Sequence, residues 1–217
     1  MEKFKIKDPV SAITHFIGFL AAVPCTAILI YMAAKEATPI HVISMAIFGA
    51  ALILLYGASS VYHTLSISDK VSALLRRVDH MMIFVLIAGT YTPVCLLPLR
   101  GPWGWTILVL IWVIAIAGIA LKALWIDAPR WLSSSIYVLM GWLIIIAFVP
   151  LVNSVPRGGV TLMVSGGVTY TVGAVIYALK RPKFNFKLFG FHELFHLFVM
   201  AGSALHIIFM FKYMVIY

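Results

Sequence analysis

Apolar residues are grouped along the chain into seven long runs that are separated by short polar segments. A hydrocarbon core of roughly 30 Å needs about 20 helical residues, because a helix rises about 1.5 Å per residue. Runs of about this length lie near residues 14–34, 42–62, 78–98, 103–121, 132–152, 159–179 and 191–211. The pattern therefore predicts an all-α membrane protein, a bundle of seven transmembrane helices that forms a single domain over residues 1–217.

The segment ahead of the third run has a helical pattern of its own. Its apolar residues follow the spacing of one helix face: Val71, Leu74, Leu75 and Val78. Ser68 and Asp69 precede them as residues that commonly begin a helix. The segment is interpreted either as an interfacial helix that leads into the third span or as an early start of that span.

The composition excludes a soluble globular domain and a disordered chain. Of the 217 residues, 63% are apolar and 11% are charged, and the mean hydropathy is +1.07. Soluble domains are about half apolar and about a quarter charged, so this chain has too little polar surface to cover a core in water. Cys25 and Cys95 fall inside apolar runs, where we expect packing thiols and neither a disulfide framework nor cysteine ligands to zinc.

Lysine and arginine residues alternate in number between the two sides of the predicted bundle. The N-terminus and the second, fourth and sixth loops carry 12 of them: Lys3, Lys5, Lys7, Lys70, Arg76, Arg77, Lys122, Arg130, Lys180, Arg181, Lys183 and Lys187. The other side carries 4: Lys35, Arg100, Arg157 and Lys212. The positive-inside rule then predicts a cytoplasmic N-terminus and an external C-terminus. Orientation in a membrane explains the net charge of +9, so no nucleic-acid partner is expected.

Ionisable side chains within the predicted spans are the candidates for function, because placing them in hydrocarbon is costly. The predicted orientation brings six of them from four spans to the cytoplasmic leaflet: His15, His63, Asp79, His80, His192 and His196. His41 and His206 fall toward the outer side. His192 and His196 are four residues apart and share one helix face, and His63 reaches the same depth from another span. Three neutral imidazoles and a water form the ligand set of a catalytic-type zinc site.

Ser59 and Asp79 fit a supporting role beside such a metal ion. Ser59 lies four residues before His63 and therefore faces the same way on its helix. Asp79 is placed to accept a hydrogen bond from a metal-bound water and to act as general base. Each residue has an alternative: the Ser59 hydroxyl would bond to the carbonyl four residues earlier, and Asp79 would pair with Arg76 or Arg77.

Three further residues near this layer have open roles. His15 is a ligand, a hydrogen-bonding neighbour of the ligands or a residue at headgroup level, and we favour the second. His80 points about 100° away from the preceding residue and is interpreted as an interfacial histidine. Residues 192–196 match H-E-x-x-H, in which the Glu is the base of zinc proteases. The alternative is that Glu193 faces the lipid headgroups beside Lys187.

The order and spacing of these residues resemble those of a known family. Ser59-x-x-x-His63, then Asp79, then His192-x-x-x-His196 over seven spans are similar to the haemolysin III family, the bacterial branch of the progestin and adipoQ receptors. The alkaline ceramidases belong to the same superfamily. The resemblance covers essentially the whole chain and includes two further segments, Ser11-Ala12-Ile13-Thr14-His15 and Gly89-Thr90-Tyr91-Thr92-Pro93. Before the first histidine the family often carries Glu and Asn, where this chain has Asp8 and Ser11.

The resemblance implies a zinc ion held by His63, His192 and His196, with Asp79 and Ser59 near its water. It also implies a multi-pass protein of a bacterial cell (plasma) membrane, whose relatives are linked to lipid amide hydrolysis, membrane fluidity and haemolysis. We therefore predict a zinc-dependent hydrolase of a lipid amide or ester, with a membrane lipid as substrate or ligand and a role in membrane lipid homeostasis. One alternative is a non-catalytic, receptor-like or membrane-homeostasis protein with structural zinc. Another is a pore-forming haemolysin, for which the spans lack a polar stripe.

Overall fold

The chain is almost entirely helical in the computed structural model, which describes residues 6–125, 127–183, 186 and 188–217. The α-helices are α1 (Pro9–Glu36), α2 (Pro39–Thr64), α3 (Asp69–Leu96), α4 (Pro102–Leu124), α5 (Arg130–Gly141), α6 (Phe148–Ser154), α7 (Arg157–Leu179) and α8 (Phe191–Phe209). A 3-10 helix, η1 (Leu143–Ala147), joins α5 to α6, and a π-helix, η2 (Met210–Met214), extends α8. No strand is found among these residues.

Most of the helices carry an apolar surface of the kind that faces lipid. Among the described residues, six helical stretches are long and apolar enough to cross a membrane: Pro9–Glu36, Pro39–Thr64, Pro102–Leu124, Arg130–Ser154, Arg157–Leu179 and Phe191–Met214. Large apolar side chains on their outer faces, such as Leu20, Val109, Ile116 and Val149, are more than half exposed. Such a surface is unfavourable in water and favourable in lipid. The prediction of an all-α, multi-pass membrane protein is confirmed.

α3 is not among those six stretches, although it packs between α2 and α4 in the bundle. Its first half carries the charged residues Asp69, Lys70, Arg76, Arg77 and Asp79. Its second half is enclosed, since every residue from 88 to 95 is buried. The helix is continuous from Asp69, where the Ser68 hydroxyl accepts a hydrogen bond from the Val71 N–H at 3.3 Å. The segment ahead of the third apolar run is therefore the early part of α3.

The apolar run near 132–152 is not one regular helix, because α5 ends at Gly141 and a 3-10 turn precedes α6. The side chain of Tyr91 from α3 occupies the break. Its hydroxyl donates to the Gly141 carbonyl at 2.7 Å and accepts from the Ile144 N–H at 3.0 Å. Backbone groups released by a break in a membrane span must be satisfied inside the protein, and Tyr91 satisfies two of them.

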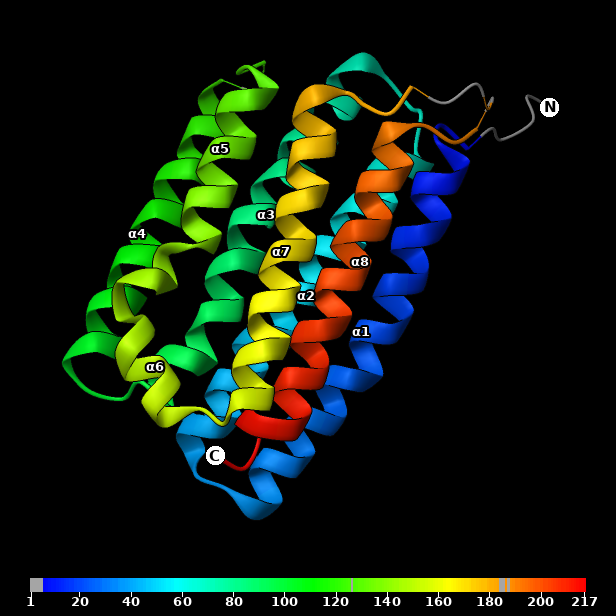
Figure 1. The fold of residues 1–217 in the computed structure, drawn as a ribbon. Helices are drawn as coiled ribbons and strands as arrows, with labels where there is room; N and C mark the ends of the chain where they lie inside the picture. The colour runs from blue at the N-terminus through cyan, green and yellow to red at the C-terminus, as the bar shows by residue number, and fades with distance from the viewer. Residues whose placement is uncertain (1–5, 126, 184–185, 187) are drawn as a thin grey trace.

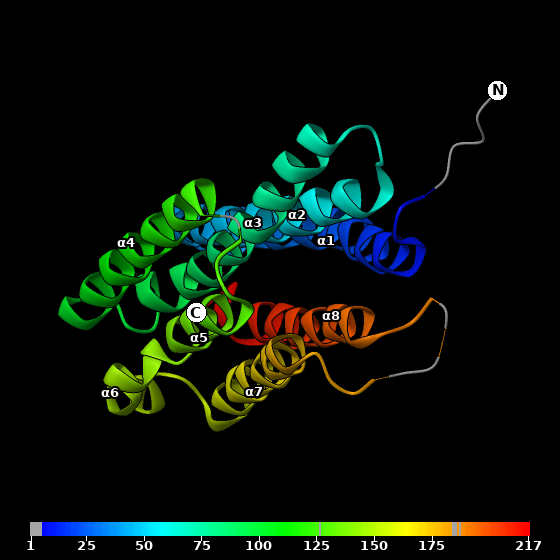
Figure 2. The same ribbon diagram turned by 90° about the horizontal axis from the view of Figure 1, so that it is seen from above.

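The helices form two facing rows when the bundle is seen from above (Figure 2). α1, α2, α3 and α4 follow one another in one row, and α8, α7 and α5 stand opposite, with α1 in contact with α8. At the upper end in Figure 1, α2 ends while α1, α3 and α8 begin. These four helices carry the ionisable residues that the sequence predicts to share one layer. The fold therefore gathers them at one end of the bundle.

Candidate metal centre

Three histidines from two helices lie close together at the end of the bundle where α2 ends and α8 begins. His63 is the penultimate residue of α2, and His192 and His196 lie in the first two turns of α8. One ligand nitrogen of each lies within 4.8 Å of the others, and Nε2 of His63 is 3.3 Å from Nε2 of His192. His63 and His196 are each 2% exposed. The three residues predicted as ligands are thus brought together in an arrangement that could hold a metal ion.

Asp8 sets the orientation of His63. Its carboxylate lies 2.9 Å from His63 Nδ1, and its backbone N–H donates to the His63 carbonyl at 2.9 Å. Because an ionised carboxylate can only accept, Nδ1 carries the hydrogen and Nε2 turns its lone pair toward the other two histidines. Metal-binding histidines usually have such a carboxylate or carbonyl partner. The donor set therefore fits a metal ion that prefers imidazole nitrogen, as zinc does.

Glu193 holds the N-terminal segment and the start of α8 together. One carboxylate oxygen accepts from the Ser11 hydroxyl at 2.8 Å, and the other accepts from the Gly190 N–H at 2.8 Å. Both oxygens are thus engaged, which favours a structural role over that of the base in the zinc-protease motif. Lys187, the predicted neighbour of Glu193, lies outside the described residues.

A small cavity beside the three histidines is lined by both predicted supporting residues, Ser59 and Asp79. The Ser59 hydroxyl is buried and has no hydrogen-bond partner in the described part of the chain, so it does not bond to the carbonyl four residues earlier. Arg76 pairs with Asp127, and among the described residues Asp79 forms no ion pair. Neither of the alternative roles for Ser59 and Asp79 is therefore seen.

His15 contacts the histidine group through its ring face. It stacks on His196 with ring centroids 3.7 Å apart and an angle of 17° between the planes. Both of its ring nitrogens are buried without a hydrogen-bond partner among the described residues. The favoured expectation, a hydrogen bond from His15 to a ligand, is wrong, because the stacked geometry places the ring beside His196 and not in line with its nitrogens.

The other histidines lie outside the group of three. Nδ1 of His80 donates to the Arg76 carbonyl at 2.7 Å, and its Nε2 lies 3.3 Å from the Tyr177 hydroxyl. His41 lies at the start of α2, with Nδ1 2.8 Å from the Thr38 hydroxyl. His206 lies farther along α8 and is described below.

A polar opening leads from the histidines to the end of the bundle. It is lined by His63, Asp79 and His192 and has a volume of about 700 Å³. Its wall carries four basic side chains: Arg76, Lys122, Arg130 and Lys180. The same wall carries four acidic side chains, Asp8, Asp79, Asp127 and Glu193, so the opening admits a polar group to the site without a preference for one sign of charge.

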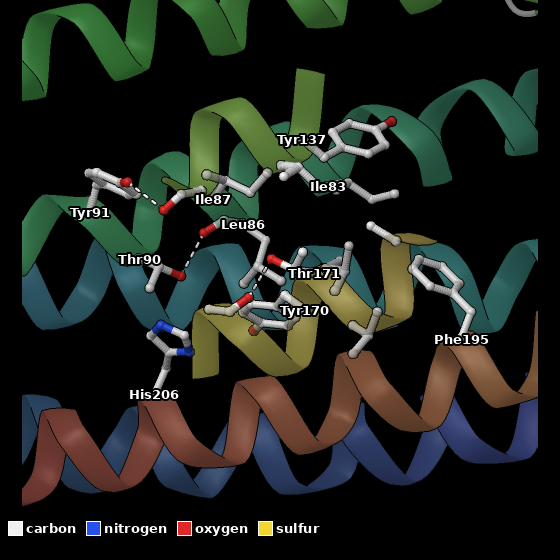
Figure 3. Close-up of a pocket in the computed structure, with 16 residues that line it drawn as sticks. Ile83, Leu86, Ile87, Thr90, Tyr91, Tyr137, Tyr170, Thr171, Phe195 and His206 are labelled. Atoms are coloured by element: carbon white, nitrogen blue, oxygen red, sulfur yellow. Dashed lines mark hydrogen bonds between the residues drawn. The ribbon is translucent and has the colours of Figure 1, made fainter. Parts of the chain in front are cut away.

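An apolar cavity extends from the site in the other direction, along α3, α7 and α8 (Figure 3). It has a volume of about 110 Å³. Six residues line both this cavity and the small one beside the histidines: Leu55, Ile83, Tyr137, Ala174, Phe195 and Val199. Figure 3 shows Phe195 and Tyr137 toward one end and His206 and Tyr91 toward the other. The histidine group thus lies between a polar opening and an elongated apolar space.

Comparison with known proteins gives the chain its relatives. The family model described as haemolysin-III related matches residues 4–207. The chain is 40% identical over 205 residues to hemolysin-3 of Bacillus cereus, covering 94% of this chain and 90% of that protein. It is 40% identical over 202 residues to a hemolysin-3 homolog of Bacillus subtilis, covering 93% and 92%. An adiponectin receptor protein of Drosophila melanogaster is 25% identical over 217 residues, which cover 89% of this chain and 47% of the receptor.

Proposed function

The chain belongs to the haemolysin III family, and from this premise we propose that it is a zinc-dependent hydrolase that cleaves an amide or ester bond of a membrane lipid. One observation carries the proposal: Asp79 and Ser59 line a cavity beside three clustered histidines, and in the described part of the chain Asp79 forms no ion pair and the Ser59 hydroxyl has no hydrogen-bond partner. A site that only ties helices together needs ligands but no free carboxylate and hydroxyl next to them. Acid–base chemistry on a bound substrate needs both.

The histidine geometry supports zinc as the cofactor, with His63, His192 and His196 as ligands. Zinc takes imidazole nitrogens at about 2.0–2.1 Å, and its catalytic sites keep three protein ligands and one open position. When bound, zinc polarises a carbonyl and lowers the pKa of a water toward about 7. The Asp8 carboxylate keeps His63 in the tautomer whose Nε2 lone pair is available to a metal ion. The His15 ring packs against one face of the His196 ring.

The residues of the chain then divide the remaining work of hydrolysis. The Asp79 carboxylate takes the proton of the attacking water and passes it to the leaving amine or alcohol, as a general base and then a general acid. The Ser59 hydroxyl lacks a hydrogen-bond partner among the described residues. It donates a hydrogen bond to the carbonyl oxygen of the lipid, which gains negative charge as water attacks the carbonyl carbon. Both residues line the same small cavity, so they act on one bound group.

The cavities on either side of the site support an amphiphilic substrate. We assign the acyl chain of the lipid to the apolar cavity and its headgroup to the polar opening. The reactive carbonyl then lies between them, beside the histidines. Burial of the chain in the apolar cavity provides binding free energy, at about 25 cal/mol for each Å² of apolar surface removed from water.

We further infer that α3 is a seventh span and that the single domain lies in a bacterial cell membrane with its N-terminus in the cytoplasm. α1 begins and η2 ends at opposite ends of the bundle, which supports an odd number of spans. Lys3, Lys5 and Lys187, which add to the cytoplasmic excess of basic residues, lie outside the described residues. Reporter fusions at the two termini should report opposite compartments, and a cytoplasmic signal from both would overturn this topology.

Hydrolysis is tested by incubating the purified protein with synthetic ceramides and phospholipids and measuring fatty acid release by mass spectrometry. We expect release from at least one lipid class, loss of release after zinc is removed by a chelator, and recovery when zinc is returned. Zinc-replete, folded protein that releases no fatty acid from any of these lipids would favour the receptor-like alternative, in which the metal is structural.

A further inference from the structure

A second buried polar group lies at the far end of the apolar cavity. His206 of α8 lines the cavity, and Figure 3 shows its ring at the end opposite Phe195. It lies ten residues beyond His196 on the same helix, which corresponds to about 15 Å along the axis. The candidate metal centre and His206 therefore lie near opposite ends of one elongated space.

The His206 ring is held in a single orientation by its neighbours. Its Nδ1 lies 2.8 Å from the Gly202 carbonyl, and the ring stacks on Tyr170 with centroids 5.3 Å apart. A Cβ atom at Gly166 would lie 2.5 Å from Nδ1, so the glycine leaves the room that the ring occupies. Because a carbonyl only accepts, Nδ1 carries the hydrogen, and Nε2 of the neutral ring is left with its lone pair.

The other polar side chains on the cavity wall are engaged within the protein. Their partners are as follows: Tyr91 donates to the Gly141 carbonyl, Tyr137 to that of His80, Thr90 to that of Leu86 and Thr171 to that of Gly167, and Tyr170 shares a hydrogen bond with Ser203. For Nε2 of His206 no hydrogen-bond partner is found in the described part of the chain. His206 is 6% exposed and lines the cavity, and its Nε2 is not fully enclosed by protein atoms, so a hydrogen-bond donor that enters the cavity can reach this acceptor.

We propose that His206 recognises a hydroxyl group near the far end of the ligand's acyl chain. The inference rests on the proposed function in assigning an acyl chain to this cavity, with the carboxyl end at the three histidines. A hydroxyl group that far along the chain donates to Nε2, and this bond replaces one that the hydroxyl loses on leaving water. An unsubstituted chain fills the cavity but leaves Nε2 unpaired.

The test measures binding of laurate, myristate and palmitate, each with and without a terminal ω-hydroxyl group, by calorimetry on the purified full-length protein. Three chain lengths are used because the acyl chain can run straight or bent between the three histidines and His206, and the length that brings its end to His206 depends on that path. We expect at least one hydroxy acid to bind roughly three- to tenfold more tightly than its unsubstituted partner, the net effect of one hydrogen bond. A hydroxyl group that found no partner in the cavity would weaken binding, because it would lose its hydrogen bonds to water. Equal or weaker binding of the hydroxy acid at every chain length would therefore overturn the inference.

Two substitutions separate the acceptor at Nε2 from the structural bond at Nδ1. His206→Asn places an amide where Nδ1 bonds to the Gly202 carbonyl and removes the acceptor at Nε2. We expect it to lose the preference for the hydroxy acid while binding the unsubstituted acid as wild type does. His206→Gln extends an amide toward the Nε2 position and should keep part of the preference. A preference that persists in His206→Asn would overturn the inference.

The binding measurements also distinguish this inference from the proposed function. Equal binding of hydroxylated and unsubstituted acids would leave the acyl cavity in place and refute only the role of His206. If none of the six acids bound, the assignment of an acyl chain to the cavity would be wrong, and the inference about His206 would be wrong with it.

Discussion

Around the three histidines, several buried polar atoms lack a partner among the described residues, whereas the side chains of Tyr56, Tyr170 and Ser203 farther along the bundle bond to one another. Eight buried side-chain nitrogen or oxygen atoms lack a partner among the described residues. Five of them belong to residues that line the small cavity: two from His15 and one each from Ser59, Ser134 and His196. Near the middle of α8, by contrast, the Tyr56 and Tyr170 hydroxyls both bond to the Ser203 hydroxyl at 2.8 Å.

The difference separates groups that stabilise the bundle from groups that, under the proposed function, bind a ligand. Unsatisfied buried polar atoms are unfavourable, and native structures keep them mainly where function requires them. The pairs formed by Tyr56, Tyr170 and Ser203 join α2, α7 and α8 and need nothing further. Under the proposed function, the atoms around the small cavity would gain partners when a metal ion, a water or a substrate is bound. Substitutions at the two kinds of position should therefore affect different measurements.

The largest effect is expected from His63→Ala, which removes one of three ligands. The variant should lose most of its zinc and all measurable lipid hydrolysis, because two imidazoles on one helix cannot hold a catalytic metal tightly. Metal content is measured by mass spectrometry on purified protein. His41→Asn serves as the matched control and should keep about one zinc per chain, because His41 lies at the start of α2, away from His63 at its end, and its Nδ1 bonds to Thr38. Full zinc content in His63→Ala would refute the ligand assignment.

A smaller effect is expected from Asp8→Ala, which leaves all three ligands but removes the carboxylate that orients His63. Loss of such a partner typically lowers metal affinity about 10- to 100-fold. Competition with a chromophoric chelator measures the change. Ser11→Ala is a suitable control, since Ser11 lies in the same segment but bonds to Glu193. Equal zinc affinity in wild type and Asp8→Ala would show that Asp8 does not support the site.

The smallest effect on function, and one confined to stability, is expected from Tyr91→Phe. Without the hydroxyl, the Ile144 N–H loses its partner in the break between α5 and η1, at a cost of about 1–3 kcal/mol in the free energy of unfolding. Unfolding in detergent should show this loss, while zinc content stays that of wild type. Tyr31→Phe, on an exposed face of α1, should be neutral. A stable Tyr91→Phe protein would mean that water satisfies the break.

Which residues gather at the site could be predicted from the sequence, because the thickness of the membrane and the repeat of the α-helix together determine their positions. Membrane thickness sets the depth of His63, Asp79 and His192, and the helical repeat sets the direction of Ser59 and His196. Neither the membrane thickness nor the helical repeat depends on which helices are in contact. The prediction therefore places these five residues together before any packing is known.

The contacts around the site could not be predicted, because they join residues distant in the chain. Asp8 meets His63 and Ser11 meets Glu193 across long separations, and no local pattern marks either pair. The break after Gly141 is equally hidden, since residues 132–152 are mostly apolar and the side chain that fills the break comes from α3. The stacking of His15 on His196 depends on how α1 packs on α8.

The central claim is that Asp79 performs acid–base chemistry beside a bound zinc ion, and a matched pair of carboxylate substitutions tests it most directly. Lipid hydrolysis and zinc content are measured together in Asp79→Asn and Glu193→Gln. We predict that Asp79→Asn keeps its zinc but loses about a hundred- to ten-thousandfold in rate, while Glu193→Gln keeps most of its activity. Wild-type turnover by a zinc-replete Asp79→Asn protein would contradict the account.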